Sequence, residues 1–312
     1  MLNQVSFIFE DDKPSRLDLA CTKYLSYFTR SQIKSLISSV LLNGKKIKMS
    51  HKLKKGDKVV CFYKDLELPS YKAEQIPLTI IYEDENVIVI NKEQNMVVHP
   101  SCSATHGTLL NALNYYRLKT SSIKDEFANI LSQEATPLLP ISNDDLLRLG
   151  IVHRLDRDTS GLIVTARNIK TQVFLKRQFK KRLVKKTYIA ILEGIPKEKE
   201  GLIKTSIFRS KSGRFASSSN LKKGRIAISK YKVIKVFDNL SLVKFRIFTG
   251  RTHQIRVHAK YIGCPVLGDT VYGKASSHFS LALHAYKIEL DISKGQHKLF
   301  KSKLPLRFKK LL

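Results

Sequence analysis

The stretch Gly150-Ile-Val-His-Arg-Leu-Asp156-Arg-Asp-Thr-Ser-Gly161 constrains this chain more than any other. Two apolar residues lead into a polar and charged run, and residues 162–166 then have the composition of a buried strand. This pattern predicts a loop held between two strands, which displays the carboxylate of Asp156 from a rigid edge. Arg154 and Arg157 flank it closely enough to favour its ionised form, which suits nucleophilic or electrostatic work better than proton donation. The alternative is an ordinary loop with a structural ion pair.

The charge of the chain is strongly positive and unevenly distributed. Its 312 residues, enough for one large and one small domain, include 56 Lys and Arg against 26 Asp and Glu, a formal net charge of +30. Residues 167–232 contain 20 basic and three acidic residues, whereas acidic residues outnumber basic ones in 120–148. Such a field indicates a polyanionic partner such as nucleic acid, with a merely solubilising surface as the alternative. A membrane partner is disfavoured, because no apolar run approaches the roughly 18 residues of a membrane span.

The four cysteines, Cys21, Cys61, Cys102 and Cys264, lie far apart in the sequence and form no C-x-x-C pair. This spacing predicts isolated, reduced thiols and not a disulfide framework or a zinc site. The N-terminus carries acidic residues and no apolar segment of the secretory type. We therefore expect a cytoplasmic protein, acting as a monomer.

Residues 14–63 predict a small domain with two helices and a hairpin. Ser15 and Asp18 have the spacing of a capping box before a first helix that reaches residue 28. Apolar residues at helical spacing predict a second helix over 33–40, and Asn43-Gly44 is a strong hairpin signal. A turn at 55–57 leads into a strand over 59–63. The polar face of this domain carries Arg16, Arg30, Lys34, Lys45 and Lys46. Residues 64–77 lack periodicity and indicate a linker.

Residues 78–312 predict a second, larger domain dominated by strands. Strand signals occur at 78–82, 87–90, 96–99, 185–192, 226–237, 240–248 and 281–290. Helical patterns occur at 108–116, 170–183 and 252–262. Residues 120–148 indicate a surface excursion with a weak helix near 127–131, and residues 208–225 a mobile loop. Many strands with few helices between them favour a mixed or antiparallel sheet in an α+β fold.

Several kinds of active site are disfavoured by the motifs. No P-loop, dinucleotide fingerprint or G-x-S-x-G elbow is present. His253 and His258 are five residues apart, which does not match metal-ligand spacing on a helix, and His258 falls on an apolar stripe as a core histidine would. Asp156 and Asp158 lie among arginines that would keep both ionised, so a glycosidase pair would lack its proton donor. What remains is one charged aspartate, nearby arginines and an aromatic platform at Tyr188.

These motifs together resemble the RluA-type RNA pseudouridine synthases. The loop from Gly150 to Gly161 resembles that family's signature, Lys186-Thr-Tyr188-Ile-Ala190 its tyrosine motif, and Gly250-Arg-Thr-His-Gln-Ile-Arg256-Val-His258 its third motif. Residues 14–63 resemble an S4 domain, an RNA-binding module, through Arg16-Leu-Asp, Thr-Arg30-Ser, Lys34-Ser-Leu-Ile and Leu42-Asn-Gly44-Lys45. The arrangement is similar to family members that modify large-subunit ribosomal RNA.

The resemblance implies a reaction and a role for each motif. A uracil would be detached from its N1–C1′ bond, rotated and rejoined through C5, without metal or cofactor. Asp156 would attack either the uracil ring or the ribose C1′, and Tyr188 would stack on the base. Arg256 would form the ion pair that positions Asp156, and Arg251 would contact substrate or the loop. Arg154 would hold the RNA backbone or fill the gap that is left when the uridine is flipped out. In the S4-like domain, Arg16, Arg30, Lys34 and Lys45 would contact RNA.

Two alternatives stay open at this point. One is a non-catalytic RNA-binding or ribosome-assembly protein that keeps the fold as a platform, and the other is the same chemistry on transfer RNA. The acidic spacer at 120–148 is longer than the family's usual one, which affects docking or substrate choice and not the three motifs.

Overall fold

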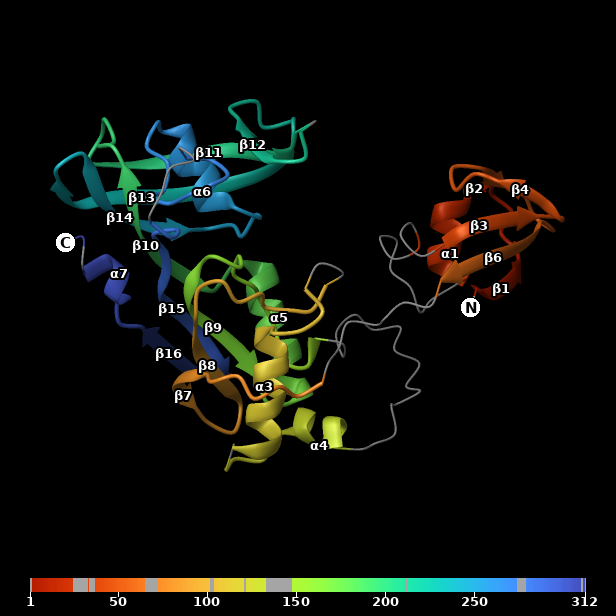
Figure 1. Cartoon of the computed structure of the whole chain (residues 1–312), viewed down its shortest axis with the longest axis horizontal. Helices are drawn as coiled ribbons and strands as arrows, with labels where there is room; N and C mark the ends of the chain where they lie inside the picture. Colours follow the sequence, from red (N-terminus) through yellow and green to blue (C-terminus); the bar gives the residue numbers. More distant parts are fainter. Residues whose placement is uncertain are drawn as a thin grey trace. The chain divides into compact units, whose positions relative to one another are not determined.

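The computed structural model describes residues 2–24, 33, 37–64, 72–101, 104–120, 122–132, 148–210, 212–273, 279–309 and 311. These residues fall into two compact units, one formed by described residues before position 65 and one by described residues after position 71 (Figure 1). The smaller unit holds described residues 2–64, and the larger unit holds described residues 72–311. Each of the two buries a hydrophobic core of its own.

The smaller unit contains a four-stranded antiparallel sheet and one described helix of eight residues. The strands, in spatial order, are β1 (Leu2–Ile8), β6 (Lys58–Lys64), β3 (Ile37–Leu42) and β4 (Lys45–Ile47). Helix α1 spans Leu17–Tyr24, and two short strands, β2 (Ser15–Arg16) and β5 (Lys52–Leu53), pair with each other. The predicted hairpin is confirmed: Asn43 and Gly44 have φ values of 49° and 85°, which a two-residue turn between strands requires.

Three predictions for the smaller unit are wrong. The segment from Ile37 onward is strand β3 and not helix, because pairing with β6 and β4 on its two sides overrides the helical spacing. The capping box does not form: the amide of Asp18 donates to the carbonyl of Met49 at 3.2 Å, and Ser15 lies in β2. The thiols of Cys21 and Cys61 are not isolated, since their sulfur atoms lie 3.9 Å apart in the core as free cysteines.

The larger unit is built on one sheet of ten strands. Its strands are β7 (Thr79–Glu83), β8 (Val87–Lys92), β9 (Ser160–Ala166), β10 (Lys185–Glu193), β11 (Glu200–Arg209), β12 (Phe215–Ser218), β13 (Arg225–Phe237), β14 (Leu240–Ile247), β15 (Leu283–Ser293) and β16 (Gln296–Lys301). The spatial order is β12-β11-β13-β14-β10-β15-β9-β8-β7, with β16 beside β15. Among these described strands only β15 and β9 pair in parallel, so the predicted mixed sheet and α+β class are confirmed for this unit.

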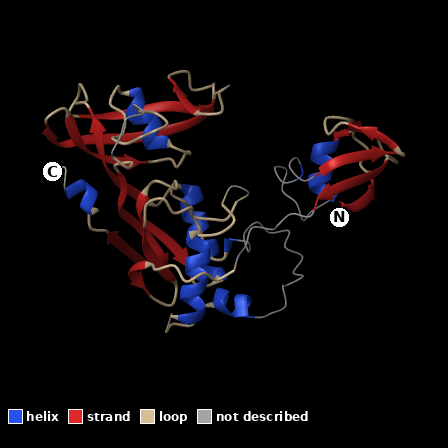
Figure 2. Ribbon diagram, in the orientation of Figure 1, coloured by secondary structure: helices blue, strands red, loops and turns tan. Residues whose placement is uncertain are grey.

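Different helices pack against the two halves of this sheet, and each half has its own main hydrophobic core. The helices are α3 (Leu109–Lys119), α4 (Glu126–Ser132), α5 (Ile169–Lys181), α6 (Gln254–Tyr261) and α7 (Leu306–Lys309). Helices α3 and α5 bury apolar side chains against the half that contains β7, β8 and β9, and α6 against the half that contains β10 and β14. Figure 2 shows the helices gathered over these two parts of the sheet. Strands β10 and β15 are hydrogen-bonded neighbours where the halves join.

Three further predictions need correction. Residues 96–99 are not a strand, because the carbonyls of Val97 and Val98 accept hydrogen bonds from the first amides of α3. The tract 208–225 is not simply a mobile loop, since it contains β12 paired with β11. Residues 122–132 are not merely a surface excursion, because Asp125 and Phe127 are buried. Strands β11 and β16 and helix α7 were not predicted.

Candidate active site

The loop that carries Asp156 is fixed at both of its ends by backbone geometry. At its start Gly150 has a φ of 85°, its carbonyl accepts from the Ala166 amide at 2.8 Å, and Ile151 forms a single bridge with Thr165 where a strand was predicted. At its end Gly161 has a φ of 115°, and a Cβ atom there would lie 2.4 Å from the Ala285 carbonyl oxygen. Only glycine permits this close approach of β9 to β15.

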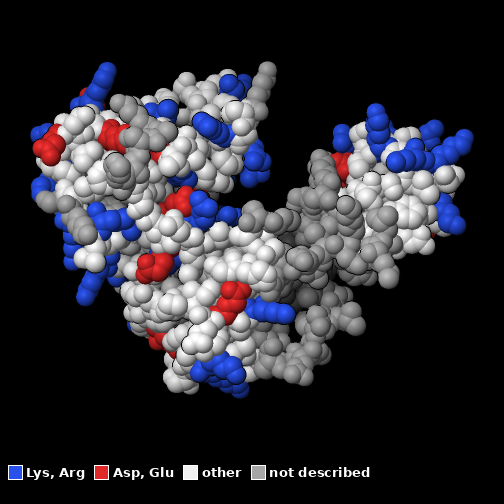
Figure 3. Space-filling view, viewed as in Figure 1, with Lys and Arg blue, Asp and Glu red and all other residues white. Residues whose placement is uncertain are grey.

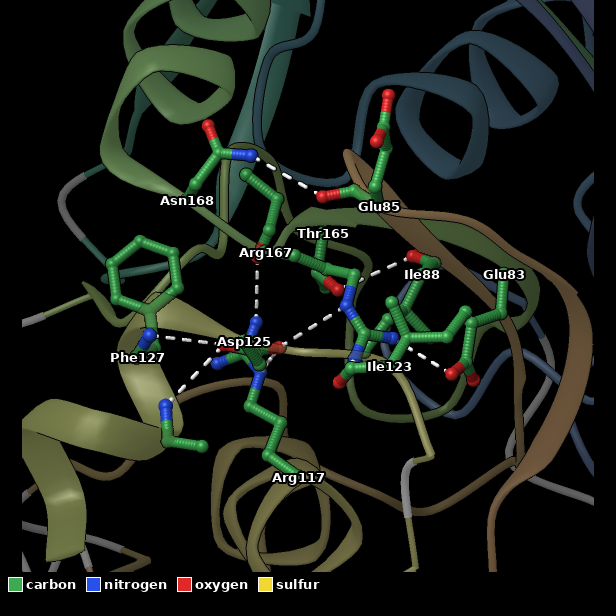
Figure 4. A network of polar contacts seen from close by, with 12 residues as sticks. Glu83, Glu85, Ile88, Arg117, Ile123, Asp125, Phe127, Thr165, Arg167 and Asn168 are labelled. Carbon is green, nitrogen blue, oxygen red and sulfur yellow. Dashed lines mark hydrogen bonds and ion pairs between the residues drawn. The ribbon is translucent and has the colours of Figure 1, made fainter.

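A buried network of charged side chains holds the backbone at the start of this loop (Figure 4). The guanidinium of Arg117 donates to the carbonyls of Leu149 and Ala166, both at 2.6 Å, and lies 3.0 Å from the carboxylate of Asp125. Arg167 lies 3.6 Å from the same carboxylate and 2.8 Å from Glu83. Burial lowers the pKa of Arg117 to about 10, and the charge of Asp125 opposes that shift. Arg117 therefore stays charged at neutral pH and ties helix α3 to the entrance of the loop.

All five residues predicted for the catalytic centre line one cavity of about 120 Å³. These residues are Arg154, Asp156, Tyr188, Arg251 and Arg256. They come from the loop, from β10, and from α6 together with the segment that leads into it. The side chain of Asp156 is half-buried and that of Arg154 is exposed. The structure thus brings together side chains from three separate sequence motifs.

Tyr188 occupies an irregular position in the middle of the sheet. Strand β10 shifts its register against β15 between Thr187 and Tyr188, and a shift of this kind re-aims the side chains that follow it. Burial, and next the charge of Asp156, raise the pKa of the Tyr188 phenol. Tyr188 is therefore neutral at physiological pH, and it presents an uncharged aromatic ring to the cavity.

The ion pair predicted between Arg256 and Asp156 is replaced by another. The Nε and Nη2 atoms of Arg256 donate to the two carboxylate oxygens of Asp269, at 2.7 and 2.8 Å. That carboxylate also accepts from the amides of Val271 and Tyr272. Burial works against the charge of Arg256, but the bond to Asp269, and the charges of Asp269 and Asp156, raise its pKa. The charge of Asp156 thus acts on Arg256 through space, without a direct bond.

Arg157, which flanks Asp156 in the sequence, pairs with the other aspartate of the loop. Its Nε atom lies 2.9 Å from the carboxylate of Asp158, the next residue in the chain. Among the described residues, no ion pair engages Asp156. The carboxylate of Asp156 is therefore available to a ligand in the cavity.

Sequence reasoning missed two residues that shape this site. Asp269 was given no role in the site, because nothing local in the sequence shows that it meets Arg256 thirteen positions earlier. His253 begins α6 with a φ of 56°, lines the cavity, and has its Nδ1 atom 2.8 Å from the Tyr272 hydroxyl. His258 is a core histidine, as predicted: it is fully buried and bonded to Thr205 and Ser229.

The basic residues predicted for the smaller unit are only partly described. Arg16 is exposed and pairs with the buried carboxylate of Asp18 at 3.0 Å. Lys45 is exposed on β4. Arg30 and Lys34 lie outside the described residues. Figure 3 shows Lys and Arg side chains clustered on the smaller unit, with few acidic ones on the visible face.

The structure places the aspartate, the tyrosine and the arginine of the three motifs in one cavity of a mixed sheet, and comparison with known proteins identifies the class as RNA-modifying isomerases. The family model described as RNA pseudouridylate synthase matches residues 86–261. The chain belongs to this family and is an RNA pseudouridine synthase, as the sequence motifs predicted.

Relatives match nearly the whole chain. The ribosomal large subunit pseudouridine synthase D of Borreliella burgdorferi is 39% identical over 302 residues, which cover 94% of this chain and 87% of that protein. The uncharacterized RNA pseudouridine synthase YlyB of Bacillus subtilis is 33% identical over 310 residues, covering 97% and 95%. The solved structure of human RNA pseudouridylate synthase domain containing 1 has a TM-score of 0.55 at 25% identity and covers 76% of this chain and 86% of that one.

Two features are absent from the described part of the chain. No described helix combines the length and apolar character needed to cross a membrane. Within the same residues, no cluster of three or more His, Cys, Asp and Glu side chains has an arrangement that could hold a metal ion.

Proposed function

We propose that this protein isomerises specific uridines of large-subunit ribosomal RNA and that Asp156 is its catalytic carboxylate. The observation that carries this proposal is the convergence of Asp156, Tyr188 and Arg256 on one cavity. The names of the relatives from Borreliella burgdorferi and Nitrosomonas europaea, both ribosomal large subunit pseudouridine synthase D, support ribosomal RNA as the substrate.

The reaction breaks the N1–C1′ bond and forms a C5–C1′ bond, and the proton lost from C5 is balanced by the proton gained at N1. A carboxylate in the position of Asp156 can attack either the ribose C1′ or the uracil ring. Attack on C1′ displaces the uracil, which rotates while the cavity walls hold it, whereas attack on the ring keeps the base bonded to Asp156 while it rotates. The neutral ring of Tyr188 supplies a stacking surface, and the fixed positive charge of Arg256 attracts the carboxylate of Asp156 across the cavity.

The target base must leave its helical stack before it can enter a cavity of this size. Extrusion costs a few kcal/mol, and least in loops and bulges. Arg154 is exposed at the rim and Arg251 lines the wall, so both can bind the displaced strand. We propose these two residues as substrate-binding and not as chemical groups.

The smaller unit is proposed to be an S4-like RNA-binding domain. Its exposed lysines on and around β4 include Lys45, Lys46 and Lys48, and none of these three forms an ion pair among the described residues. Replacing Lys45 and Lys46 with Gln should lower the salt dependence of RNA binding, by about 0.7–0.9 in log–log slope for each phosphate that is no longer neutralised. An unchanged slope would show that this surface does not contact RNA. We further propose that the protein is cytoplasmic and that it acts as a monomer. Sedimentation of the purified chain would test the monomeric state.

The reaction itself is tested with Asp156→Asn and the neighbouring Asp158→Asn as its control. Ribosomal RNA from cells that lack the gene serves as substrate, and pseudouridine formation and RNA binding are both measured. We expect Asp156→Asn to bind RNA without isomerising it, and Asp158→Asn to remain active. Equal activity of Asp156→Asn and wild type would contradict the assignment. If the wild type isomerises transfer RNA and not ribosomal RNA, its substrate is transfer RNA. If the wild type binds RNA without isomerising it, a non-catalytic RNA-binding protein is favoured.

A further inference from the structure

A second cavity of about 380 Å³ lies directly beside the one that contains Asp156. The two share Arg154, Tyr188, Ile247, Gly250 and Arg251 in their walls. Its volume is within the roughly 300–1,000 Å³ of pockets that hold small ligands. A molecule that fills both cavities would therefore be longer than one uridine.

Among the described residues that line the second cavity, five are Lys or Arg and none is acidic. Arg182, Lys186 and Lys180 join Arg154 and Arg251 around it. The ammonium of Lys186 lies 5.8 Å from the ring centre of Phe179 and 3.9 Å from the place a Cβ atom would occupy on Gly250. Lys186 thus bridges helix α5 and the loop that leads into α6.

Arg182 is directed to this place by an unusual backbone conformation. It follows α5 with φ 60° and ψ 30°, in the left-handed region, and its amide donates to the carbonyls of Gln178 and Phe179. A left-handed residue other than Gly, Asn or Asp is uncommon. The conformation turns the chain from α5 into β10, and it leaves the Arg182 side chain exposed at the cavity.

These cations repel one another in the free protein. Burial, and next the charge of Arg182, lower the pKa of Lys186. Burial, followed by the charges of Arg182 and Arg225, lowers the pKa of Arg251. The last carbonyls of α5 favour nearby cations, but they carry only about half an elementary charge in total. An anion bound here would relieve this repulsion.

We propose that this cavity is a phosphodiester subsite, in which Arg182 and Lys186 bind a backbone phosphate next to the target uridine. The inference rests on the proposed function, since it assumes that the uridine occupies the adjoining cavity. Guanidinium and ammonium groups together suit a phosphate, which accepts bidentate bonds from arginine and a point charge from lysine. Binding at this position would hold the strand while the base is out of its stack.

The test measures binding of the full-length protein to a fluorescent pentanucleotide, AAUAA, whose single uridine sets the register. Arg182→Asn, Lys186→Gln and the double variant are compared with Lys185→Gln. Lys185 is the matched control, because it is adjacent on β10, pairs with Glu289 at 3.2 Å and does not line the cavity. Asparagine tolerates the left-handed conformation, so Arg182→Asn tests the charge without a backbone change even if Lys186→Gln fails to fold.

We expect each cavity variant to weaken binding by about tenfold or more, the value of one charge-assisted hydrogen bond. The slope of log Kd against log salt should fall by about 0.7 in the double variant, the value for one phosphate of a single strand. An uncharged methylphosphonate at one linkage beside the uridine should weaken binding to wild type by the same factor and have no effect on the double variant.

The proposal is overturned if Lys185→Gln weakens binding as much as Lys186→Gln does. It is also overturned if a methylphosphonate at any linkage weakens binding to the double variant as much as binding to wild type. The phosphates would then be attracted by the overall positive charge of the protein and not by one subsite. Binding does not require turnover. A wild-type protein that binds in this pattern but isomerises nothing would contradict the proposed function and leave the subsite standing.

Discussion

Arg256 holds Asp269, and not Asp156, through two parallel hydrogen bonds of 2.7 and 2.8 Å. The pair is buried, with side-chain exposures of 4% and 0%. Asp269 in turn is held by two backbone amides of the turn that follows it. Arg256 is therefore fixed in orientation before any substrate binds, and it presents a constant positive charge to Asp156. This arrangement makes Asp269 a positioning residue that acts through Arg256.

Asp269→Asn should damage both activity and stability. It leaves a buried guanidinium without its counter-charge, which costs about 3–5 kcal/mol of unfolding free energy. Misplacement of Arg256 should lower kcat on ribosomal RNA by about a hundredfold. The matched control is Asp291→Asn, whose half-exposed pair with His297 should be worth at most about 1 kcal/mol. Denaturant unfolding and single-turnover kinetics measure the two effects. Wild-type kcat in Asp269→Asn would show that Arg256 does not depend on this partner.

Gly161→Ala should be far more harmful than the same change at Gly213. Both glycines have positive φ values, 115° and 80°, but a Cβ atom on Gly161 meets the backbone of Ala285 at 2.4 Å, whereas Gly213 has open space. The conformational cost alone is about 1–2 kcal/mol and applies to both. The additional clash at Gly161 separates β9 from β15 and displaces the loop of Asp156. Unfolding midpoints and activity check this, and equal losses in the two variants would argue against a close strand contact.

Arg117→Met should loosen the entrance of the catalytic loop. It removes two bonds to the carbonyls of Leu149 and Ala166. Of the two described cations beside the buried carboxylate of Asp125, it leaves only Arg167. We expect a loss of about 3–5 kcal/mol in unfolding free energy. The exposed pair of Lys185 and Glu289 provides a control, since Lys185→Gln should cost at most about 1 kcal/mol. Hydrogen exchange of the amides in residues 149–161 should increase in Arg117→Met, and unchanged protection there would contradict the role of the network.

Two buried histidines should make stability fall with acid. Burial lowers the pKa of His258 and of His284 to about 4, below the ordinary 6.5 of the unfolded chain. Between those values the unfolded state binds more protons, so the free energy of unfolding decreases as pH falls from about 6.5 towards 4. Each histidine contributes at most about 1.4 kcal/mol per pH unit. Replacing His258 with Asn should reduce the slope of unfolding free energy against pH over this range. The same slope in the variant would show that His258 is not the titrating group.

Local chemistry explains what could be predicted from the sequence. The turn at Asn43-Gly44, the start of α3 after Thr108 and the hairpin between β13 and β14 depend on neighbouring residues. The five cavity residues were also predicted, because each lies in a motif that is readable by itself. Their convergence followed from the family resemblance and not from spacing.

The features that could not be predicted depend on contacts between distant residues. Residues 37–42 have apolar side chains at helical spacing, and only pairing with β6 makes them a strand. Cys21 and Cys61 are forty positions apart, so their contact cannot be predicted without knowing how α1 packs against β6. Both Asp269 and Asp156 lie near Arg256, and the sequence alone does not show which of the two carboxylates forms the ion pair with it.

The measurement that tests the central claim most directly is carbodiimide mapping of ribosomal RNA from cells without the gene. The cells are complemented with wild type, Asp156→Asn or Asp158→Asn, and primer extension reports carbodiimide-modified pseudouridines as stops. We predict large-subunit stops that are absent without the gene, that return with wild type and Asp158→Asn, and that do not return with Asp156→Asn. Stops restored by Asp156→Asn would contradict the account, because isomerisation would then proceed without the carboxylate on which it depends.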